Sequence, residues 1–264
     1  NNQLTGNTFC DNGNGTVTFD IDSGGATNTG SNNMCRTANN YNDSDATGGG
    51  CARECAVNGC DTGAAVLFRC GDTVTQSCTL NGTLASTGTC FTVGADNVTI
   101  DGGGFSLVGN NVFDTYGVYA YGRKNVTVKN LEVYDYYGGI YFDTVSDSFV
   151  QSNKLHTNKN GLALAFSSNN QITSNTVSDN EYAGILLSHN SGNNVVSGNT
   201  TDGNDFGIRL LFNADQNDIL NNTILNSREN GIYLDFDTNL NEILANTVCD
   251  NVVDIFQDAV AGSN

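Results

Sequence analysis

Two aspartates separated by one residue are the strongest candidates for metal ligands. Asp235 and Asp237 lie in the string DFDTN, where carboxylate and amide oxygens recur at alternate positions. Calcium binds hard oxygen ligands of this kind. The string lacks the glycine and the final glutamate of an EF-hand loop, so it predicts a weak calcium site, and no other cofactor is expected. Two further pairs share the spacing and are weaker candidates: Asp20 with Asp22, and Asp43 with Asp45.

Nine cysteines beside two histidines favour disulfide bonds over metal or redox chemistry. Eight of them cluster toward the N-terminus and are expected to pair among themselves: Cys10, Cys35, Cys51, Cys55, Cys60, Cys70, Cys78 and Cys90. Their number leaves the pairing open. Cys249 stands apart and is either free or paired between chains. Zinc binding by Cys51, Cys55 and Cys60 is the weaker alternative, because no nearby histidine or paired C-x-x-C motif supports it.

Seven of the ten tyrosines lie within one short stretch of the chain. They are Tyr116, Tyr119, Tyr121, Tyr134, Tyr136, Tyr137 and Tyr141. Tyrosine favours strands in any case, but a contiguous exposed patch of aromatic rings more often marks a contact with protein or sugar. We expect these side chains to form such a patch, with subunit contact as the first interpretation and carbohydrate stacking as the second.

Seven N-x-S/T sequons offer acceptors for N-linked glycans. They are Asn14, Asn42, Asn81, Asn97, Asn125, Asn199 and Asn221. Chance alone produces several sequons in a chain this rich in asparagine and threonine. Together with the cysteine cluster, they still favour a glycosylated surface.

These residues belong to a short repeat. Six segments begin with glycine at a nearly constant spacing, and a seventh begins with Asp254. The glycines are Gly117, Gly139, Gly161, Gly184, Gly207 and Gly231. An asparagine column has the same period: Asn130, Asn153, Asn175, Asn199, Asn222 and Asn246. Self-similarity at a fixed period of this length indicates a repeat architecture.

The period and composition predict an all-β fold, a right-handed single-stranded parallel β-helix with coils of about 22–24 residues. The runs between the glycines are short and alternate in polarity, so one side of each strand points inward. Three strands and three bends make one coil, and coils stack about 4.8 Å apart. We expect the β-helix over residues 64–264. We expect residues 1–63 to form a Cys/Gly/Asn-rich N-terminal module that serves as a cap or an assembly arm.

Apolar residues at fixed offsets from the glycines predict inward columns. The first column is Val118, Ile140, Leu162, Ile185, Ile208, Ile232 and Ile255, and the second is Ala120, Phe142, Leu164, Leu187, Leu210, Leu234 and Gln257. A third set predicts an inward aromatic stack: Phe166, His189, Phe212 and Phe236. We expect the repeated glycines and asparagines to occupy bends with positive φ.

Three strings resemble the parallel β-helix repeats of secreted NosD-like and pectate-lyase-like proteins, with Asn-rich, Cys-bearing archaeal surface proteins the closest. They are NVTIDGGGFSLVG at 97–109, NNQITSNTVSDNEYAGILL at 169–187 and NDILNNTILNSRENGIYL at 217–234. The resemblance covers residues 64–258 and implies the fold. It implies no single function, because the superfamily includes polysaccharide lyases and hydrolases, copper-accessory proteins, tailspikes, adhesins and surface-layer parts.

The resemblance implies no catalytic residue in this chain. Lyases of this fold use an acidic calcium cluster with an arginine or lysine base, and pectin hydrolases use NTD, DD, GHG and RIK motifs on successive coils. This sequence has NTTDGND at 199–205 and GIRLL around Arg209 without the other motifs. We interpret Arg209 as an outward residue in a surface ion pair with Asp235 and Asp237. His189 is interpreted as a packed aromatic substitute.

The net charge of −18 argues against nucleic acid and anionic lipid as partners. No apolar run is long enough to span a membrane. The cysteine cluster and the sequons predict an extracellular or cell-surface protein that carries N-glycans.

The last coil of a β-helix exposes unpaired backbone groups. The residues after Ile255 are too few for an amphipathic capping helix. Four apolar residues are therefore expected to form a bare C-terminal edge: Val252, Val253, Ile255 and Phe256. The sequence thus predicts a structural protein, not an enzyme, that assembles head-to-tail with its own copies into a filament or surface array. The alternatives are a carbohydrate- or calcium-binding surface module, and a polysaccharide lyase or hydrolase.

Overall fold

The chain forms two units, residues 1–57 and residues 58–264, and each is described by itself. The computed structural model describes residues 58–63 and 66–258 with their side chains, and the backbone of seven short strands before residue 58. Those strands pair in parallel: β1 (Gln3–Thr5) with β4 (Asn28–Ser31), β4 with β7 (Tyr41–Asp43), β2 (Thr8–Phe9) with β5 (Met34–Cys35), and β3 (Ile21–Asp22) with β6 (Ala38–Asn39). Predictions for the following side chains fall outside the described ones: Cys10, Cys35, Cys51, Cys55, Asn14, Asn42, Asp20, Asp22, Asp43 and Asp45.

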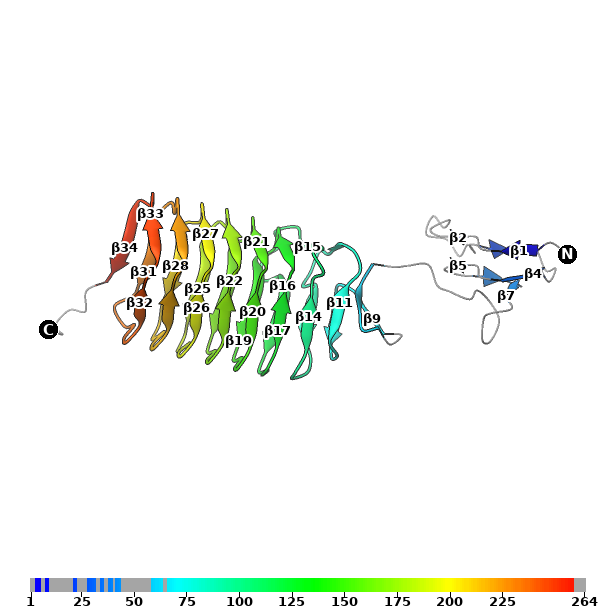
Figure 1. The fold of residues 1–264 in the computed structure, drawn as a ribbon, viewed down its shortest axis with the longest axis horizontal. Coiled ribbons are helices and arrows are strands. Elements are labelled where there is room, and N and C mark those ends of the chain that lie inside the picture. Colours follow the sequence, from blue (N-terminus) through cyan, green and yellow to red (C-terminus); the bar gives the residue numbers. More distant parts are fainter. Residues whose placement is uncertain are drawn as a thin grey trace. The chain divides into compact units, whose positions relative to one another are not determined.

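The second unit is a parallel β-helix in which each coil contributes one strand to each of three sheets (Figure 1). The first sheet is β10 (Asp72–Val74), β13 (Phe91–Val93), β16 (Tyr116–Tyr121), β19 (Gly138–Asp143), β22 (Asn160–Ala165), β25 (Ala183–Ser188), β28 (Phe206–Leu210), β31 (Asn230–Leu234) and β34 (Val253–Gln257). The second is β9 (Leu67–Phe68), β8 (Cys60–Asp61), β11 (Cys78–Leu80), β14 (Thr99–Asp101), β17 (Thr127–Lys129), β20 (Phe149–Gln151), β23 (Gln171–Thr173), β26 (Val195–Ser197), β29 (Asp218–Leu220) and β32 (Glu242–Leu244). The third is β12 (Leu84–Ala85), β15 (Ser106–Val108), β18 (Glu132–Tyr134), β21 (Lys154–His156), β24 (Thr176–Ser178), β27 (Thr200–Asp202), β30 (Thr223–Leu225) and β33 (Thr247–Cys249).

The register confirms the predicted parallel β-helix and its two apolar columns. Val118 pairs with Ile140, and that column continues coil by coil to Ile255. The second column likewise runs from Ala120 to Gln257. Both columns are buried as far as the coil of β31, so the apolar side chains of successive coils form one continuous core. Stacking buries the apolar face that a single coil could not bury.

The repeated glycines do not occupy bends with positive φ, and that prediction is wrong. They lie inside the strands of the first sheet, where neighbouring coils approach closely. A Cβ atom on Gly161 would lie 2.8 Å from the backbone oxygen of Gly184 and 2.4 Å from the Val177 side chain. Glycine is therefore needed there for the close approach of backbones. Most bends with positive φ use polar residues instead, such as Asn169 at 58° and Ser174 at 56°.

The asparagine column is a buried ladder that links successive coils. Asn153, Asn175, Asn199 and Asn222 are at most 2% exposed. Each side-chain Oδ1 accepts the backbone N–H of its partner in the preceding coil. Asn130 is not part of this ladder, because it occupies a bend at φ 53° and Leu131 takes the ladder position. Two more ladders occupy the other corners: Asn170, Asn194, Asn217 and Asn241, and Asn158, Asn180 and Asn204.

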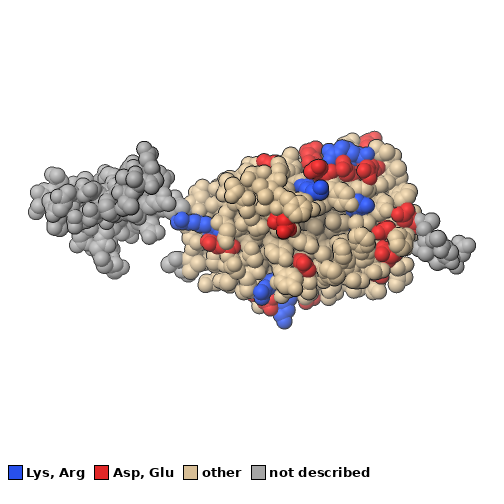
Figure 2. All heavy atoms as spheres, turned by 180° about the vertical axis from the view of Figure 1, so that it is seen from behind, with Lys and Arg blue, Asp and Glu red and all other residues tan. Residues whose placement is uncertain are grey.

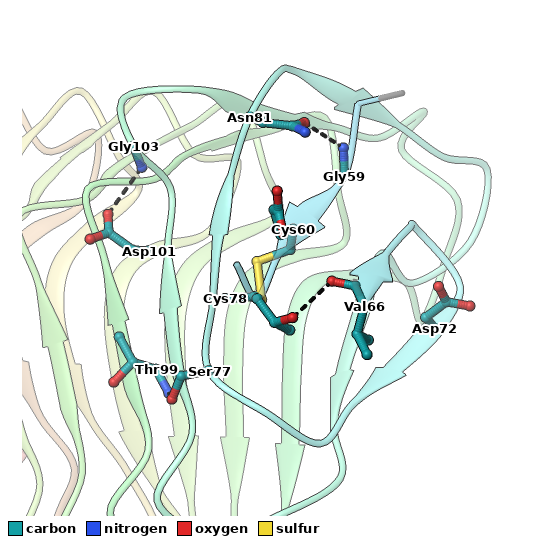
Figure 3. The surroundings of a disulfide bond; sticks show 12 residues. Gly59, Cys60, Val66, Asp72, Ser77, Cys78, Asn81, Thr99, Asp101 and Gly103 are labelled. Carbon is teal, nitrogen blue, oxygen red and sulfur yellow. Dashed lines mark hydrogen bonds between the residues drawn. A yellow bond between two sulfur atoms is a disulfide. The ribbon is translucent and has the colours of Figure 1, made fainter. Parts of the chain in front are cut away.

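Two disulfides join the first coils of the β-helix. Cys60 bridges to Cys78, linking β8 with β11 (Figure 3), and Cys70 bridges to Cys90. β8 runs antiparallel to both β9 and β11, and a hydrogen bond from the Gly59 N–H to the Asn81 side chain reinforces this end. The disulfide prediction is thus confirmed for these four cysteines. Their pairing also removes Cys60 from the alternative zinc set.

The last described strand, β34, is an edge of the first sheet. Its residues are exposed, and among residues 58–63 and 66–258 no strand pairs with its outer side. Val252 is 74% exposed and Ile255 50% exposed, because no further described coil covers them. Val253 and Phe256 are exposed as well. The same part of the chain has no helix of the length and apolarity that a membrane span requires.

Candidate functional site

The outward face of the first sheet carries a hollow of about 300 Å³, which we call the tyrosine hollow. It is lined by Phe113, Asp114, Tyr116, Tyr137, Gly138, Tyr141, Asn160, Ala163, Leu186, Ser188 and His189. The register of β19, β22 and β25 places Tyr141, Ala163 and Leu186 side by side on successive coils. The hollow forms because Ala163 is small between two large neighbours.

Aromatic rings build one wall of the tyrosine hollow. The Tyr116 ring stacks on Tyr119 at 5.3 Å and lies 5.0 Å from Tyr141, measured between ring centroids. Phe113, from the loop before β16, meets Tyr137 edge-on at 4.8 Å. These are the offset and edge-to-face arrangements that aromatic pairs favour. The rings therefore hold one another in place before any ligand binds.

Gly138 has no side chain and therefore leaves space at the floor of the tyrosine hollow. A Cβ atom at this position would lie 2.8 Å from the Tyr116 ring. Gly138 pairs with Asn160 in the next coil, whose side-chain Oδ1 is buried and has no hydrogen-bond partner. A buried oxygen without a donor is costly to the fold.

Three phenols in this region have raised pKa values: Tyr116, Tyr119 and Tyr141. Burial, followed by the hydrogen bond to Asp114, raises the pKa of Tyr116 far above its ordinary value. That bond runs from the Tyr116 hydroxyl to Asp114 Oδ1 at 2.6 Å. Burial, followed by the charge of Asp143, also raises the pKa of Tyr119 and of Tyr141. The hollow therefore presents neutral rings and hydroxyl groups.

The structure places the seven predicted tyrosines in different surroundings, and only some of them lie at the tyrosine hollow. Tyr136 is fully buried, and its hydroxyl lies 2.8 Å from Ser86 Oγ, so it belongs to the core. Burial raises the pKa of Tyr136 to about 12. Tyr134 lies on β18 in the third sheet and stacks on His156 at 4.9 Å, away from the hollow. Tyr121 is exposed and does not line the hollow.

Phe113 is a wall residue that the sequence analysis missed. It is 76% exposed, and its edge contact with Tyr137 separates the tyrosine hollow from a second hollow of about 810 Å³. The string NNVFD carried a signal, because a phenylalanine in a polar loop has no place in the apolar columns. The second hollow is polar, and in it Arg228 Nε lies 2.6 Å from Asp205.

The predicted inward aromatic stack points outward, and that prediction is wrong. Phe166 and Phe212 are 52% and 47% exposed. His189, also exposed, lies between them, with ring centroids 5.2 Å from Phe166 and 4.8 Å from Phe212. The three residues have φ of 50°, 53° and 52°, which turns the side chains away from the core. Phe236, in the following coil, is exposed as well. We call Phe166, His189 and Phe212 the aromatic ladder.

Arg209 points outward between Leu186 and Tyr233, but the predicted ion pair with Asp235 and Asp237 does not form. Its guanidinium carbon lies 3.9 Å from the centroid of the Phe206 ring and 4.7 Å from that of Tyr233. The guanidinium also donates to the Tyr182 hydroxyl. Burial among these rings lowers the pKa of Arg209. A cation–π contact replaces the ion pair.

The aspartate pair proposed for calcium lacks further acidic ligands. Asp235 is buried and accepts the Phe236 N–H at 2.9 Å, which occupies one of its oxygens. Asp237 has one buried oxygen without a hydrogen-bond partner. Among the described residues, no three His, Cys, Asp or Glu side chains come together as metal ligands.

One predicted glycosylation acceptor is excluded by its position. Asn199 is 1% exposed, and its amide nitrogen donates to Ile172 O and Asn222 Oδ1 inside the ladder. A glycan there would break the core. The other described sequon asparagines are exposed: Asn81, Asn97, Asn125 and Asn221.

Charge on the described surface is mixed. Figure 2 shows a largely uncharged face on which basic and acidic atoms lie in common groups. Lys129 lies 3.1 Å from Asp101, and Lys154 lies 2.7 Å from Glu132. None of the residues lining the tyrosine hollow is Lys or Arg. The lining of the tyrosine hollow, like the chain as a whole, therefore has more acidic than basic side chains.

Solved structures with a similar fold include carbohydrate-active enzymes. The periplasmic alginate epimerase AlgG gives a TM-score of 0.61 at 16% identity, over 89% of this chain and 58% of that one. A mutant of the same epimerase gives 0.54 at 18% identity, over 80% of this chain and 53% of that one. DFA-IIIase from Arthrobacter chlorophenolicus A6, solved with DFA-III, gives 0.44 at 14% identity, over 68% and 39%. The chain thus spans somewhat more than half of the epimerase's length, and the likeness shows the fold.

The sequence itself matches one protein family. No curated protein matches it. The family model described as "Periplasmic copper-binding protein (NosD)" matches residues 86–263. The described residues do not fit a copper centre, because no cluster of three His, Cys, Asp or Glu side chains is formed among them and copper sites use imidazole, thiolate or thioether ligands. The match nevertheless covers more than half of the chain and agrees with its parallel β-helix, and the protein therefore belongs to the NosD family.

Proposed function

We propose that this protein binds a saccharide in the tyrosine hollow. The observation that carries the proposal is a set of mutually packed rings around a low floor on a rigid sheet. Ligand sites are concave and largely pre-formed, with aromatic walls and a few polar groups that fix orientation. The apolar CH face of a pyranose ring fits the flat face of Tyr141, and its hydroxyls find Asp114, Asn160 and the tyrosine hydroxyls at the rim.

Rigidity favours affinity in such a site. Tyr116, Tyr119 and Tyr141 lie on strands whose neighbours on both sides are hydrogen-bonded, so few of these side chains need to be ordered when a ligand binds. The fold shared with an alginate epimerase supports a carbohydrate ligand by analogy. The two disulfides further support an oxidising compartment outside the cytoplasm, such as the periplasm or the cell surface.

A glycan array followed by calorimetric titration tests the proposal. Tyr141→Ala removes the central ring and is expected to weaken binding of the best glycan at least tenfold. Tyr134→Ala is the matched control, because it removes a ring stacked on His156 in a different sheet. Absence of binding across the array, or equal losses in both variants, would overturn the proposal. Cleavage of the bound glycan in the same samples would replace binding with catalysis.

Self-assembly is a second candidate, favoured by one observation. The outer side of β34 is unpaired among the described residues, and its apolar side chains are exposed. Such an edge can pair with another chain, although the charge of −18 opposes association until salt screens it. Light scattering with and without added salt or calcium tests this. A strictly monomeric protein under all conditions would retire the idea.

A further inference from the structure

We propose that the aromatic ladder extends the tyrosine hollow into a track for an uncharged polysaccharide that lies parallel to the β-helix axis. This inference rests on the proposed function of the hollow. It adds a second contact surface, a direction for the bound chain and a class of ligand.

The backbone at the ladder marks these rings as unusual. Positive φ is strained for bulky side chains and is ordinarily left to glycine, asparagine and aspartate. Most of the other bends use small or polar residues such as Asn169, Asn193 and Asp179, and Leu240 at φ 56° is the one other large apolar residue with positive φ among the described ones. Only three aromatic or imidazole residues among the described ones have positive φ, and they are the three members of the ladder, on consecutive coils. Residues held in sparsely populated conformations cluster at functional sites.

The fold does not need these rings. Phe166 and Phe212 leave about half of their surface exposed, so they add little to the core. Thr144, one coil before Phe166, takes the corresponding bend at φ 58° with a small polar side chain. An exposed row of apolar rings generally marks a contact surface. The identity of the ladder residues is therefore explained by a ligand and not by packing.

The ladder is continuous with the hollow. His189 belongs to both, and its Nδ1 lies 3.1 Å from Oγ of Ser188, which also lines the hollow. The ring centroids follow one another at 5.2 and 4.8 Å, close to the coil spacing of about 4.8 Å. Because successive rings lie on successive coils, a chain that contacts all of them runs along the axis. The coil spacing is also close to the length of one pyranose unit along a polysaccharide.

The charges around the track favour an uncharged polysaccharide as the ligand. The hollow lining contains Asp114 and neither Lys nor Arg. Arg209, the nearest cation along the outward column, is enclosed by Phe206 and Tyr233. A uronate polymer would bring carboxylates to a hollow whose lining has no cation, because Lys159, 5.8 Å from the centroid of the Tyr137 ring, lines the second hollow instead. Stacked nucleic-acid bases are disfavoured for the same reason, since their phosphates need basic residues.

The experiment compares short and long oligosaccharides of the neutral glycan that binds best. The double variant Phe166→Asn with Phe212→Asn removes two rings and places there a residue suited to positive φ. It is expected to lose about tenfold or more in affinity for the long oligomer and to keep the affinity for a short one that fills only the hollow. Phe105→Asn is the control, because Phe105 is an exposed ring between β14 and β15, outside the track.

The outcomes separate the two proposals. No binding of either oligomer to the native protein would overturn the proposed function. Native binding that is equal for short and long oligomers, and unchanged in the double variant, would overturn the track and leave the hollow. Tighter binding of a uronate oligomer than of a neutral oligomer of equal length would overturn the uncharged ligand. Circular dichroism of the double variant verifies that it is folded.

Discussion

The side-chain amide of Asn175 donates a hydrogen bond to Oδ1 of Asn199 in the next coil, at 3.0 Å. The Asn175 backbone N–H donates to the same oxygen at 2.9 Å, and the Asn175 amide also donates to Val150 O at 2.9 Å. Both asparagines are buried. One buried side chain therefore ties three coils together at a corner of the β-helix.

Replacing Asn175 should destabilise the β-helix strongly. Asn175→Ala leaves the Asn153 N–H and the Val150 carbonyl without these partners, and each unsatisfied buried group costs about 1–3 kcal/mol. We expect a loss of about 3 kcal/mol or more in chemical denaturation. Asn110→Ala, at an exposed loop position, is the control and should stay within about 0.5 kcal/mol of the native protein. Equal effects of the two changes would contradict the structural role of the ladder.

The glycines inside the first sheet should tolerate no side chain. Gly161→Ala would press a methyl group against the Gly184 carbonyl at 2.8 Å and force the coils apart. A drop in the thermal midpoint of several degrees is expected. Gly88→Ala is the matched control, because nothing lies within 4 Å of its Cβ position and its φ is not positive. The prediction fails if both alanine variants melt together.

Acid should selectively weaken one surface cluster. Hydrogen bonds from Lys154, then Ser106 and His156, lower the pKa of Glu132 to about 2 from 4.5. Because the folded-state pKa is depressed, the stabilisation is present above about pH 4.5 and lost as the pH falls toward about 2. Glu132→Gln should therefore be less stable than the native protein near neutral pH. The difference between their free energies of unfolding should shrink as the pH falls. The exposed Glu242→Gln is the control. A gap that stays constant across pH would refute the linkage.

Reduction should loosen the first coils before the rest. Each disulfide closes a loop, with sequence separations of 18 and 20 residues, and such links typically contribute about 2–4 kcal/mol. Coils of a solenoid depend mainly on their neighbours, so the loss should stay local. Hydrogen exchange under reductant should show faster exchange in β11 and β13 than in β28. Cys249→Ser should leave the exchange pattern unchanged, since Cys249 forms no disulfide.

Filling the tyrosine hollow should abolish saccharide binding while keeping the fold. Ala163→Leu projects a larger side chain into the hollow between Tyr141 and Leu186. A tenfold or greater loss of affinity is expected in titration calorimetry, with little change in the thermal midpoint. Ala85→Leu, at an exposed strand position, is the control for added bulk. Unchanged binding in Ala163→Leu would place the ligand elsewhere.

Periodicity predicted most of the fold. The spacing of the glycines predicted the coil length, and the alternation after them predicted which side chains of Val118 to Ile232 point inward. A shift of one residue would turn every side chain to the opposite face, so the register is strongly specified wherever one face is buried. Two cysteine pairs and the exposed residues of β34 agree with the same analysis.

The sequence by itself determined the coil, the register and the inward columns, because these depend on local alternation and a fixed period. Only the tertiary structure decided the candidate site. A positive φ at the end of a strand turned the Phe166 side chain outward. In the bend before β19, the Tyr136 side chain is buried, whereas the side chain of the next residue, Tyr137, lines the tyrosine hollow. The hollow itself depends on which small residue lies beside which large one on the neighbouring coil. That neighbour is a whole coil away along the chain, and its side-chain direction is fixed only when the coils stack.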